Sequence, residues 1–504
     1  MVWAKQLTID LKELHMKTSE LFNDLSKIVG KKNILTNDED LTKYNNDWRG
    51  FYKNNSLCVL FPESANIIKK IVKYCYKKNI KIVPQGGNTS LTGASVPTFN
   101  NKEIIINFSK LNKILEIDKN NLTLLVESGS ILANIKEYLD KQNCYFPIDL
   151  SSSGSCMIGG NIATNAGGIN ALKYGSTKEN IIGLEIVTGD GSIITSLSKM
   201  KKNNTGYDLK SIICNSEGTL GLITKVLLKI FPKPQNNFTF FAGYDDLQTC
   251  IKSFNQIREL YYDKLESAEL IPDLSFAVCI KNNFLKKHFF EKKRPWYVIF
   301  RLNLYEDKDL FQDIFEKNFN KINKNISDIL LPHSIDQEKK IWKFRDDLVE
   351  AYKMEGRIVT NDISIPLNRM DIFFKTAEKE IKKMSSKIKI HPFGHIGDGN
   401  IHYNMILQNN ISHESYLKLR NKIYSFVNEL VEEYGGSFSA EHGIGQIKKN
   451  SLLKFKSKNE IDVMKKLSIL LRGIEISFVT ILPSILYAST KSSLNFQIFF
   501  FLID

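Results

Sequence analysis

The chain has 504 residues, of which 42% are hydrophobic and 25% are charged, which is enough apolar material for two or three globular domains. Its net charge of +14 comes from 69 basic against 55 acidic residues, yet only nine of the basic residues are arginine. Lysine runs such as KKNN at 201–204 lack arginine and aromatic neighbours, which argues against a nucleic-acid partner and leaves a small anionic substrate compatible with the charge.

Cysteine usage and the first residues indicate the compartment. The seven cysteines are spread along the chain without a C-x-x-C pair, which argues against a disulfide framework and favours a reducing environment. The first residues, MVWAKQLTIDLKELHMK, carry charges and no apolar core, so they do not form a secretory signal. We expect a cytoplasmic protein, or a mitochondrial matrix protein in a eukaryote, with peripheral membrane association left open.

In chain order, residues 1–45 are expected to form a helical N-terminal segment, because Leu21, Leu25 and Ile28 have helical spacing. Helix-like and strand-like runs then alternate up to the Pro-Lys-Pro sequence at 232–234, which marks a domain boundary. The Gly-Asp-Gly sequence at 189–191 lies between two strand-like runs and predicts a β-hairpin.

Residues 235–435 predict a second, α+β domain. Aromatic-rich strands such as NFTFFAGY and PWYVIFRLNLY alternate there with charged amphipathic helices. After residue 467 the chain becomes apolar, but Glu475 and Pro483 interrupt the best window for a membrane span. A replaced or out-of-frame end is the favoured interpretation of residues 468–504.

Two glycine-rich loops carry the clearest signal for a ligand. The first is PQGGNTSLTGASVP at 84–97 and the second is DLSSSGSCMIGGNIATNAGG at 149–168. Glycines let the backbone N–H groups face an anion, and the neighbouring hydroxyls add donors. Neither loop has the lysine ending of a Walker loop or the spacing of a Rossmann fingerprint. Tight turns alone would explain one such loop but not both in one domain.

A histidine-rich loop, HPFGHIGDGNIHYN at 391–404, and the later Glu441-His442 pair contain four of the eight histidines. A lone histidine is more often structural, but four in two glycine-rich segments favour a site. Two histidines and one carboxylate bind zinc, manganese or iron(II) and leave positions open for a chelating substrate.

Both glycine loops, with KYGSTKENIIGLEIVTGDGSII and NTGYDLKSIICNSEGTLGLIT, resemble the FAD-binding domain of the vanillyl-alcohol oxidase flavoprotein superfamily. Within it, the D-2-hydroxy-acid dehydrogenase branch is the most similar, which includes D-2-hydroxyglutarate dehydrogenase, D-lactate dehydrogenase and the glycolate oxidase catalytic subunit. The resemblance covers about 40–467. It implies an α+β fold class, with a two-subdomain PCMH-type FAD-binding domain at 46–234 and a substrate (cap) domain with an antiparallel sheet at 235–435. The chain would then return to the FAD domain at 436–467 and end in an atypical tail at 468–504.

The resemblance also implies residue roles. FAD would be held non-covalently, because neither loop contains a histidine. The implied FAD-binding residues are Pro84, Gly86, Gly87, Asn88, Thr89, Ser90, Ser155, Gly159, Gly160, Thr164, Asn165, Gly168, Glu217, Gly218 and Ile223, the last three on the adenosine side.

The implied metal ligands are His395, His402 and Glu441, with zinc as the expected metal and manganese or iron as alternatives. His442 would be the catalytic base. Arg345 would bind the substrate carboxylate, although helical spacing alone equally fits a solvated arginine paired with Asp346 or Glu350. His391 is expected near the ligands, and Asp398 to brace the loop or a ligand imidazole.

These parts imply oxidation of a D-2-hydroxy acid to the 2-oxo acid. Without an iron–sulfur or haem signature, the electrons would pass to a separate electron-transfer flavoprotein, quinone or cytochrome. Relatives carry a basic residue where this chain has Thr360 and Asn361, so the substrate stays open between 2-hydroxyglutarate, lactate and similar acids. The altered end keeps a second hypothesis, a non-catalytic or impaired flavoprotein. A homodimer is compatible with the sequence.

Overall fold

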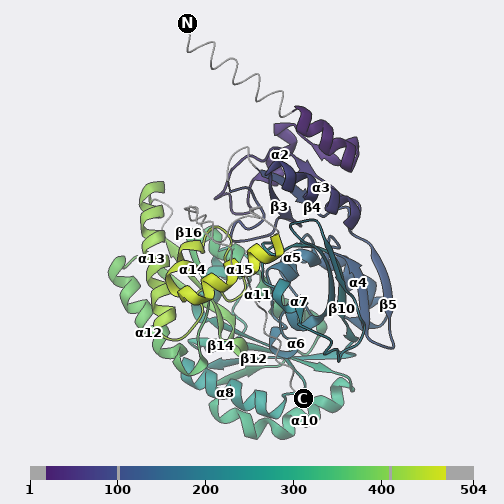
Figure 1. Ribbon diagram of the computed structural model, residues 1–504. Helices are drawn as coiled ribbons and strands as arrows, with labels where there is room; N and C mark the ends of the chain where they lie inside the picture. Colours follow the sequence, from purple (N-terminus) through teal and green to yellow (C-terminus); the bar gives the residue numbers. More distant parts are fainter. Residues whose placement is uncertain (1–18, 99–102, 408–410, 473–504) are drawn as a thin grey trace, which may run out of the picture.

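The computed structural model describes residues 19–98, 103–407 and 411–472. Figure 1 shows a first domain, coloured purple to blue, beside a second domain, coloured teal to green, with the yellow helices α14 and α15 close to both. The described part of the first domain contains two larger sheets, each with a separate core, and a two-stranded sheet in which Cys144–Tyr145 pairs with Phe231–Pro232.

The smaller sheet of the first domain has the strand order β1-β2-β4-β3. Helix α3 (Ala65–Lys78) connects β2 to β3, and its buried residues are spaced as one apolar face. Ser64 caps its first turn by accepting a hydrogen bond from the Ile67 N–H, and Asn79 ends it with a φ of 52°. The other elements are β1 (Ile34–Leu35), α2 (Asp38–Asn45), β2 (Val59–Leu60), β3 (Lys81–Gln85) and β4 (Glu103–Asn107).

The second sheet of this domain is antiparallel in the order β5-β6-β10-β8-β9. Strands β8 and β9 pair from Val187 and Ile193 outward, and Gly191 has a φ of 80° in the turn, so the predicted hairpin is confirmed. The elements are β5 (Ile114–Asp118), β6 (Thr123–Glu127), α4 (Leu132–Asp140), β7 (Cys144–Tyr145), α5 (Ile158–Ala163), α6 (Ala171–Tyr174), β8 (Ile181–Val187), β9 (Ile193–Ser196), α7 (Leu209–Ile213), β10 (Leu222–Lys229) and β11 (Phe231–Pro232).

The second domain contains one seven-stranded antiparallel sheet, as the sequence predicts, in the order β15-β12-β14-β13-β17-β18-β16. Side chains alternate between its faces, so Phe240 belongs to the core that contains residues of α8, α10, α12 and α13, whereas Phe241 belongs to the core that contains residues of α9 and α11. The strands are β12 (Asn236–Tyr244), β13 (Leu265–Pro272), β14 (Trp296–Leu304), β15 (Asp328–Leu330), β16 (Arg357–Ser364), β17 (Lys389–His395) and β18 (Asn400–Leu407). The helices are α8 (Leu247–Leu260), α9 (Asp273–Lys281), α10 (Lys308–Ile322), α11 (Ile335–Glu355), α12 (Leu367–Met384) and α13 (His413–Glu433).

After α13 the chain comes back to the first domain through α14 (Lys449–Phe455) and α15 (Lys458–Arg472). Leu467 and Leu471 pack against the core of the antiparallel sheet of the first domain, and the Leu471 carbonyl accepts a hydrogen bond from the Gly189 N–H at 3.0 Å. Residues 468–472 of the predicted tail therefore continue α15, and 473–504 lie outside the described residues. Of the helices described, none is both long and apolar enough to cross a membrane.

Candidate active site

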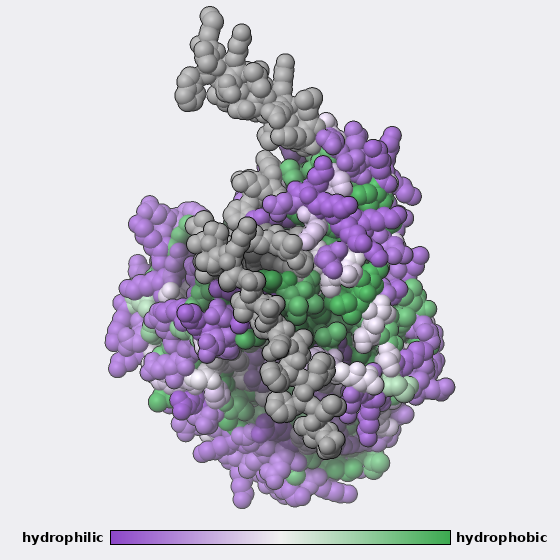
Figure 2. Space-filling view, in the orientation of Figure 1, coloured by the Kyte–Doolittle hydropathy of each residue, from purple (hydrophilic) through white to green (hydrophobic). Residues whose placement is uncertain are grey.

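A cavity of about 1300 Å³ is lined by both domains. Its lining includes both glycine loops of the first domain, and Arg345, His395, His402, Glu441 and His442 from the remainder of the chain. On the face that Figure 2 shows, hydrophobic residues gather near the centre between largely polar upper and lower parts. The two signals that the sequence carries, glycine loops and histidine loops, thus meet in one cavity.

Fourteen of the fifteen predicted FAD-binding residues line this cavity, and Asn165 does not. The Asn165 side-chain oxygen accepts hydrogen bonds from the Ser176 hydroxyl and the Lys178 N–H, both at 2.9 Å. With a φ of 50°, Asn165 holds a backbone turn, a position that asparagine tolerates better than most residues.

Glu217 lines the cavity, but both of its carboxylate oxygens already accept hydrogen bonds from the protein backbone. Its two oxygens accept hydrogen bonds from the Ile444 N–H at 2.7 Å and the Gly445 N–H at 2.8 Å. Glu217 therefore ties the first domain to the loop that carries Glu441 and His442, and its contact with the adenosine side of FAD stays a prediction.

The two glycine loops touch each other at Gly87. A Cβ atom on Gly87 would lie 1.9 Å from the Ser155 carbonyl oxygen, so only glycine lets the loops approach this closely. The next residue, Asn88, has a φ of 53°, and its side chain donates to the Asn46 carbonyl at 2.8 Å. The loops are thus fixed by backbone geometry, with their free surface turned to the cavity.

Two buried side chains of the lining fit a polar ligand. The Ser128 hydroxyl and the side-chain amide oxygen of Asn161 have no hydrogen-bond partner among the residues that the structure describes. A buried polar atom without a partner costs about 1–3 kcal/mol, which a bound hydroxyl-rich or phosphate-rich cofactor would offset. The glycine loops and these two atoms together suit FAD.

His395 and His402 are brought together by the β17–β18 connection. His395 ends β17, the 3₁₀ turn Ile396–Asp398 follows, and Gly399, with a φ of 67°, leads into β18. His395 Nε2 lies 3.7 Å from one carboxylate oxygen of Glu441, and His402 Nε2 lies 4.0 Å from the other. Two imidazole nitrogens thus face one carboxylate, a donor set that suits a divalent metal ion.

Glu269 on β13 links His395 to Arg345. It is the cross-strand neighbour of His395 in the sheet, accepts from His395 Nδ1 at 2.6 Å and accepts from Arg345 Nε at 2.7 Å. This bond leaves His395 Nε2 for a ligand, as is usual for metal-binding histidines. It also uses only one of the five N–H donors of Arg345, a residue of the cavity lining, so the guanidinium keeps donors for a substrate.

The charges along this chain of contacts stabilise one another. Burial opposes ionisation of Glu269, but Arg345 and His395 outweigh it and lower its pKa to about 2. Burial likewise acts to lower the pKa of His395, but Glu269 and Glu441 raise it to about 10. Without a metal, His395 therefore carries a second ring proton, and its positive charge lies between the carboxylates of Glu269 and Glu441. A metal ion that binds His395 Nε2 would displace the proton on that nitrogen.

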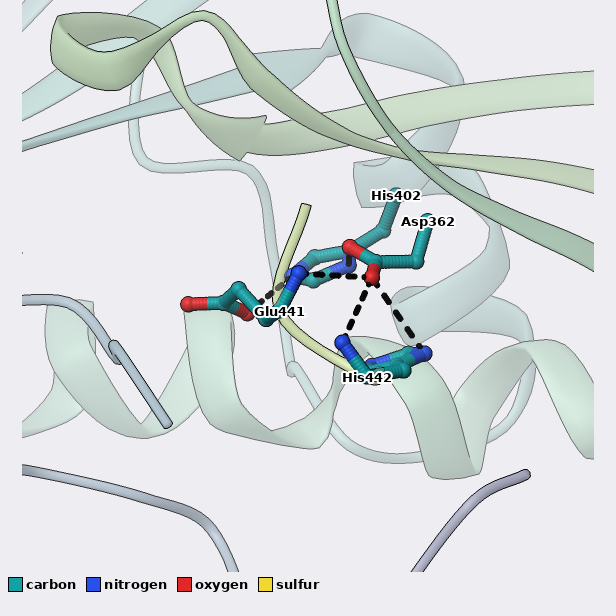
Figure 3. Close-up of side chains that lie close together, drawn as sticks. All are labelled: Asp362, His402, Glu441 and His442. Carbon is teal, nitrogen blue, oxygen red and sulfur yellow. Dashed lines mark hydrogen bonds and ion pairs between the residues drawn. The ribbon is translucent and has the colours of Figure 1, made fainter. Parts of the chain in front are cut away.

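Asp362 on β16 organises the other side of the cluster, as Figure 3 shows. One of its oxygens accepts from the N–H groups of Glu441 and His442, both at 2.9 Å, and the other accepts from the Asn400 amide at 3.0 Å. His402 is its cross-strand neighbour, with Nδ1 at 3.8 Å, and His442 Nδ1 lies at 3.7 Å.

A second possible metal-binding group consists of four residues whose ligand atoms lie within 4.8 Å of one another: Asp362, His402, Glu441 and His442. It shares His402 and Glu441 with the predicted set but has Asp362 and His442 in place of His395. We favour His395, His402 and Glu441 as ligands, because the Asp362 carboxylate already accepts three hydrogen bonds, whereas Glu441 accepts one, from the Gly168 N–H at 2.7 Å. Burial opposes its ionisation, but His442 and Lys448 (Nζ at 3.9 Å) hold its pKa well below the usual range. Asp362 therefore positions the loop that carries Glu441 and His442.

Sequence reasoning misplaced two residues and missed three. Asp398 is exposed, and the carboxylate that accepts a hydrogen bond from His395 is Glu269 instead. His391 is buried against Tyr352, with ring centroids 4.9 Å apart, and is not part of the cavity lining. Glu269, Asp362 and Lys448 were not predicted. Strand pairing brings the first two beside the histidines, and a single buried acidic residue in a strand-like run gives no sequence signal for that.

Fold and site together define a flavin-dependent oxidoreductase, and comparison with known proteins agrees. Residues 56–196 match a family described as FAD binding domain, and residues 233–471 match FAD linked oxidases, C-terminal domain. Two solved structures share the fold: p-cresol methylhydroxylase with substrate bound (TM-score 0.74, 15% identity, 91% of this chain and 95% of that one) and alkyldihydroxyacetonephosphate synthase (TM-score 0.68, 18% identity, 90% and 83%).

Among curated proteins, the chain is 32% identical to mitochondrial D-2-hydroxyglutarate dehydrogenase of Arabidopsis thaliana, over 88% of this chain and 78% of that one. It is 32% identical to the mitochondrial enzyme of Danio rerio (86% and 80%) and 28% identical to D-2-hydroxyglutarate dehydrogenase of Stutzerimonas stutzeri (89% and 96%). The chain therefore belongs to the family of FAD-linked D-2-hydroxy-acid dehydrogenases to which these relatives belong. The family and the α+β fold class predicted from the sequence are confirmed.

Proposed function

We propose that the protein oxidises a D-2-hydroxy acid, such as 2-hydroxyglutarate or lactate, to the corresponding 2-oxo acid. One observation carries this proposal: a single cavity joins two glycine loops suited to FAD with two histidines that face one carboxylate. The names of the relatives agree with the substrate class. The relatives from Arabidopsis thaliana and Danio rerio are named as mitochondrial, which supports a mitochondrial location for a eukaryotic chain.

Bound FAD would accept the C2 hydride, that is, the two electrons and one proton of the C2–H bond. The two glycine loops would hold the cofactor without a covalent bond, since neither contains a histidine. A separate acceptor would then take the electrons, and an electron-transfer flavoprotein, a quinone or a cytochrome are the candidates.

A divalent metal, zinc by preference, would sit between His395, His402 and Glu441 and lower the pKa of the substrate hydroxyl. Arg345 holds the carboxylate of the acid, because Glu269 fixes its guanidinium through Nε at 2.7 Å. His442 accepts the hydroxyl proton at Nε2. Its Nδ1 lies 3.7 Å from Asp362, which orients the ring, and its backbone is held by the same carboxylate.

The test is anaerobic bleaching of the flavin absorbance by D- and L-2-hydroxy acids, with identification of the product. The proposal predicts that a D-acid bleaches the flavin and yields one 2-oxo acid per flavin, while the L-acid does neither. Flavin that stays oxidised with every D-acid would contradict it and favour the alternative of a non-catalytic flavoprotein.

A further inference from the structure

Lys448 is a buried lysine of the cavity lining that the proposed reaction leaves without a role. The residue is only 3% exposed. A lysine is almost never buried so completely without a charged or hydrogen-bonding partner, because its ammonium group loses its hydration there. The contacts of the Lys448 Nζ atom therefore indicate what the residue does.

The first contact of this ammonium group closes a loop. Lys448 Nζ donates a hydrogen bond to the Phe438 carbonyl at 2.9 Å, which joins the two ends of the loop that carries Glu441 and His442. The backbone of Lys448 is fixed as well, since its N–H donates to the Ile444 carbonyl at 3.0 Å. The ammonium group is thus held against the loop by both its side chain and its backbone.

The second contact is with the Asp362 carboxylate. Lys448 Nζ lies 3.9 Å from the Oδ2 atom of Asp362. The same oxygen accepts hydrogen bonds from the N–H groups of Glu441 and His442, both at 2.9 Å. Lys448 is therefore connected to these two residues in two ways, through the loop that its own hydrogen bond closes and through this carboxylate.

Asp362 needs a compensating cation because it is only 2% exposed. A buried carboxylate is costly unless an opposite charge and hydrogen bonds compensate it. The Nδ1 atoms of His402 and His442 lie 3.8 and 3.7 Å from Asp362, but a metal ligand and a proton acceptor must both be neutral imidazoles when they act. Among the ion pairs of the described residues, the compensating charge is therefore that of Lys448.

We infer that Lys448 is a positioning residue for this site. Its ammonium group compensates the charge of Asp362 and closes the loop that this carboxylate holds. The ligand Glu441 and the base His442 thereby keep the places that metal binding and proton transfer require. The inference rests on the proposed function and deepens it. Since Lys448 acts through Asp362, loss of its charge should leave the binding of substrate and FAD unchanged.

The experiment is a double-mutant cycle on the holoenzyme with Lys448→Met, Asp362→Asn and the variant that carries both changes. In Lys448→Met, the metal affinity and kcat should each fall about 10- to 100-fold, as expected when a group that orients a metal ligand is lost, while KM and the FAD content stay at their wild-type values. The double variant should lose little more than Asp362→Asn alone, because the cation acts through this carboxylate. Lys448→Arg keeps the charge and should recover part of the loss.

Amide hydrogen exchange of residues 438–446 gives a reading that needs neither a bound metal nor turnover. Exchange should be at least about tenfold faster in Lys448→Met than in the wild type. Lys449→Met is the matched control, because Lys449 is the next residue, is partly exposed and is absent from the cavity lining. If Lys448→Met is too unstable to purify, the double variant replaces it, since both buried charges are absent there.

Losses that multiply in the double variant would overturn the inference, because the lysine would then act independently of Asp362. So would a raised KM with an unchanged kcat, or a loss of FAD, since Lys448 would then bind the substrate or the cofactor. Amide exchange in Lys448→Met that matches Lys449→Met would also reject it. If no hydroxy acid reduces the flavin, the proposed function fails. Faster exchange in Lys448→Met that Lys448→Arg partly reverses would still uphold the positioning role.

Discussion

The two halves of the cavity are built by different means. The half from the first domain is made by backbone, in loops where Gly87 and Ser155 approach more closely than any side chain permits. The half around His395 and His402 is made by side chains, which strands β13, β16, β17 and β18 place beside one another. Adding atoms to the loops of the first half should therefore impair FAD binding. Removing functional groups from the second half should impair metal binding.

The largest effect is expected at Gly87. In Gly87→Ala the new methyl group would lie 1.9 Å from the Ser155 carbonyl oxygen, so the loops must separate and FAD should be lost almost completely. The measurement is FAD per protein from the absorbance spectrum, with circular dichroism to verify folding. Gly154→Ala in the second loop is the control, because a Cβ there meets nothing within 4 Å. A folded Gly87→Ala protein with full FAD would contradict the backbone account.

The next effect is expected at His402. His402→Ala removes one ligand, so the metal content should fall to near zero and the rate of flavin reduction by about a thousandfold, while FAD stays bound. Elemental analysis and stopped-flow absorbance measure the two quantities. His413→Ala, an exposed histidine at the start of α13, should change neither. Loss of FAD together with the metal would show that the two halves are not independent.

A smaller effect is expected at Glu269. Glu269→Gln keeps the shape but weakens the bonds to His395 and Arg345, so the metal affinity should fall about 10- to 100-fold. Competition with a chelator measures that affinity. Glu266→Gln is the control: this carboxylate, also buried on β13, bonds Tyr145 and Asn303 instead. An unchanged metal affinity in Glu269→Gln would mean that His395 is not a ligand.

The same contrast explains how far the sequence could predict the molecule. The glycine loops are contiguous, so their residues could be named in advance, apart from Asn165, whose side chain turns to Ser176 and Lys178. The histidines are also close in sequence. Glu269 is 126 residues from His395, and only strand pairing brings them together. Asp362 is 79 residues from Glu441, and the two meet through a hydrogen bond from the Glu441 N–H to the Asp362 carboxylate. Periodicity predicts which face of a strand is buried, but not which strand lies next to it.

We propose that side chains of the second half hold a metal that the reaction needs, while the backbone of the first half holds FAD. The most direct measurement is the anaerobic rate of flavin reduction by a D-2-hydroxy acid before chelation, after chelation and after the metal is restored. The metal-free protein is expected to keep its FAD, to lose flavin reduction and to regain it when zinc or manganese is added. A protein shown to be metal-free that reduces its flavin at the original rate would contradict a role of the metal in the reaction.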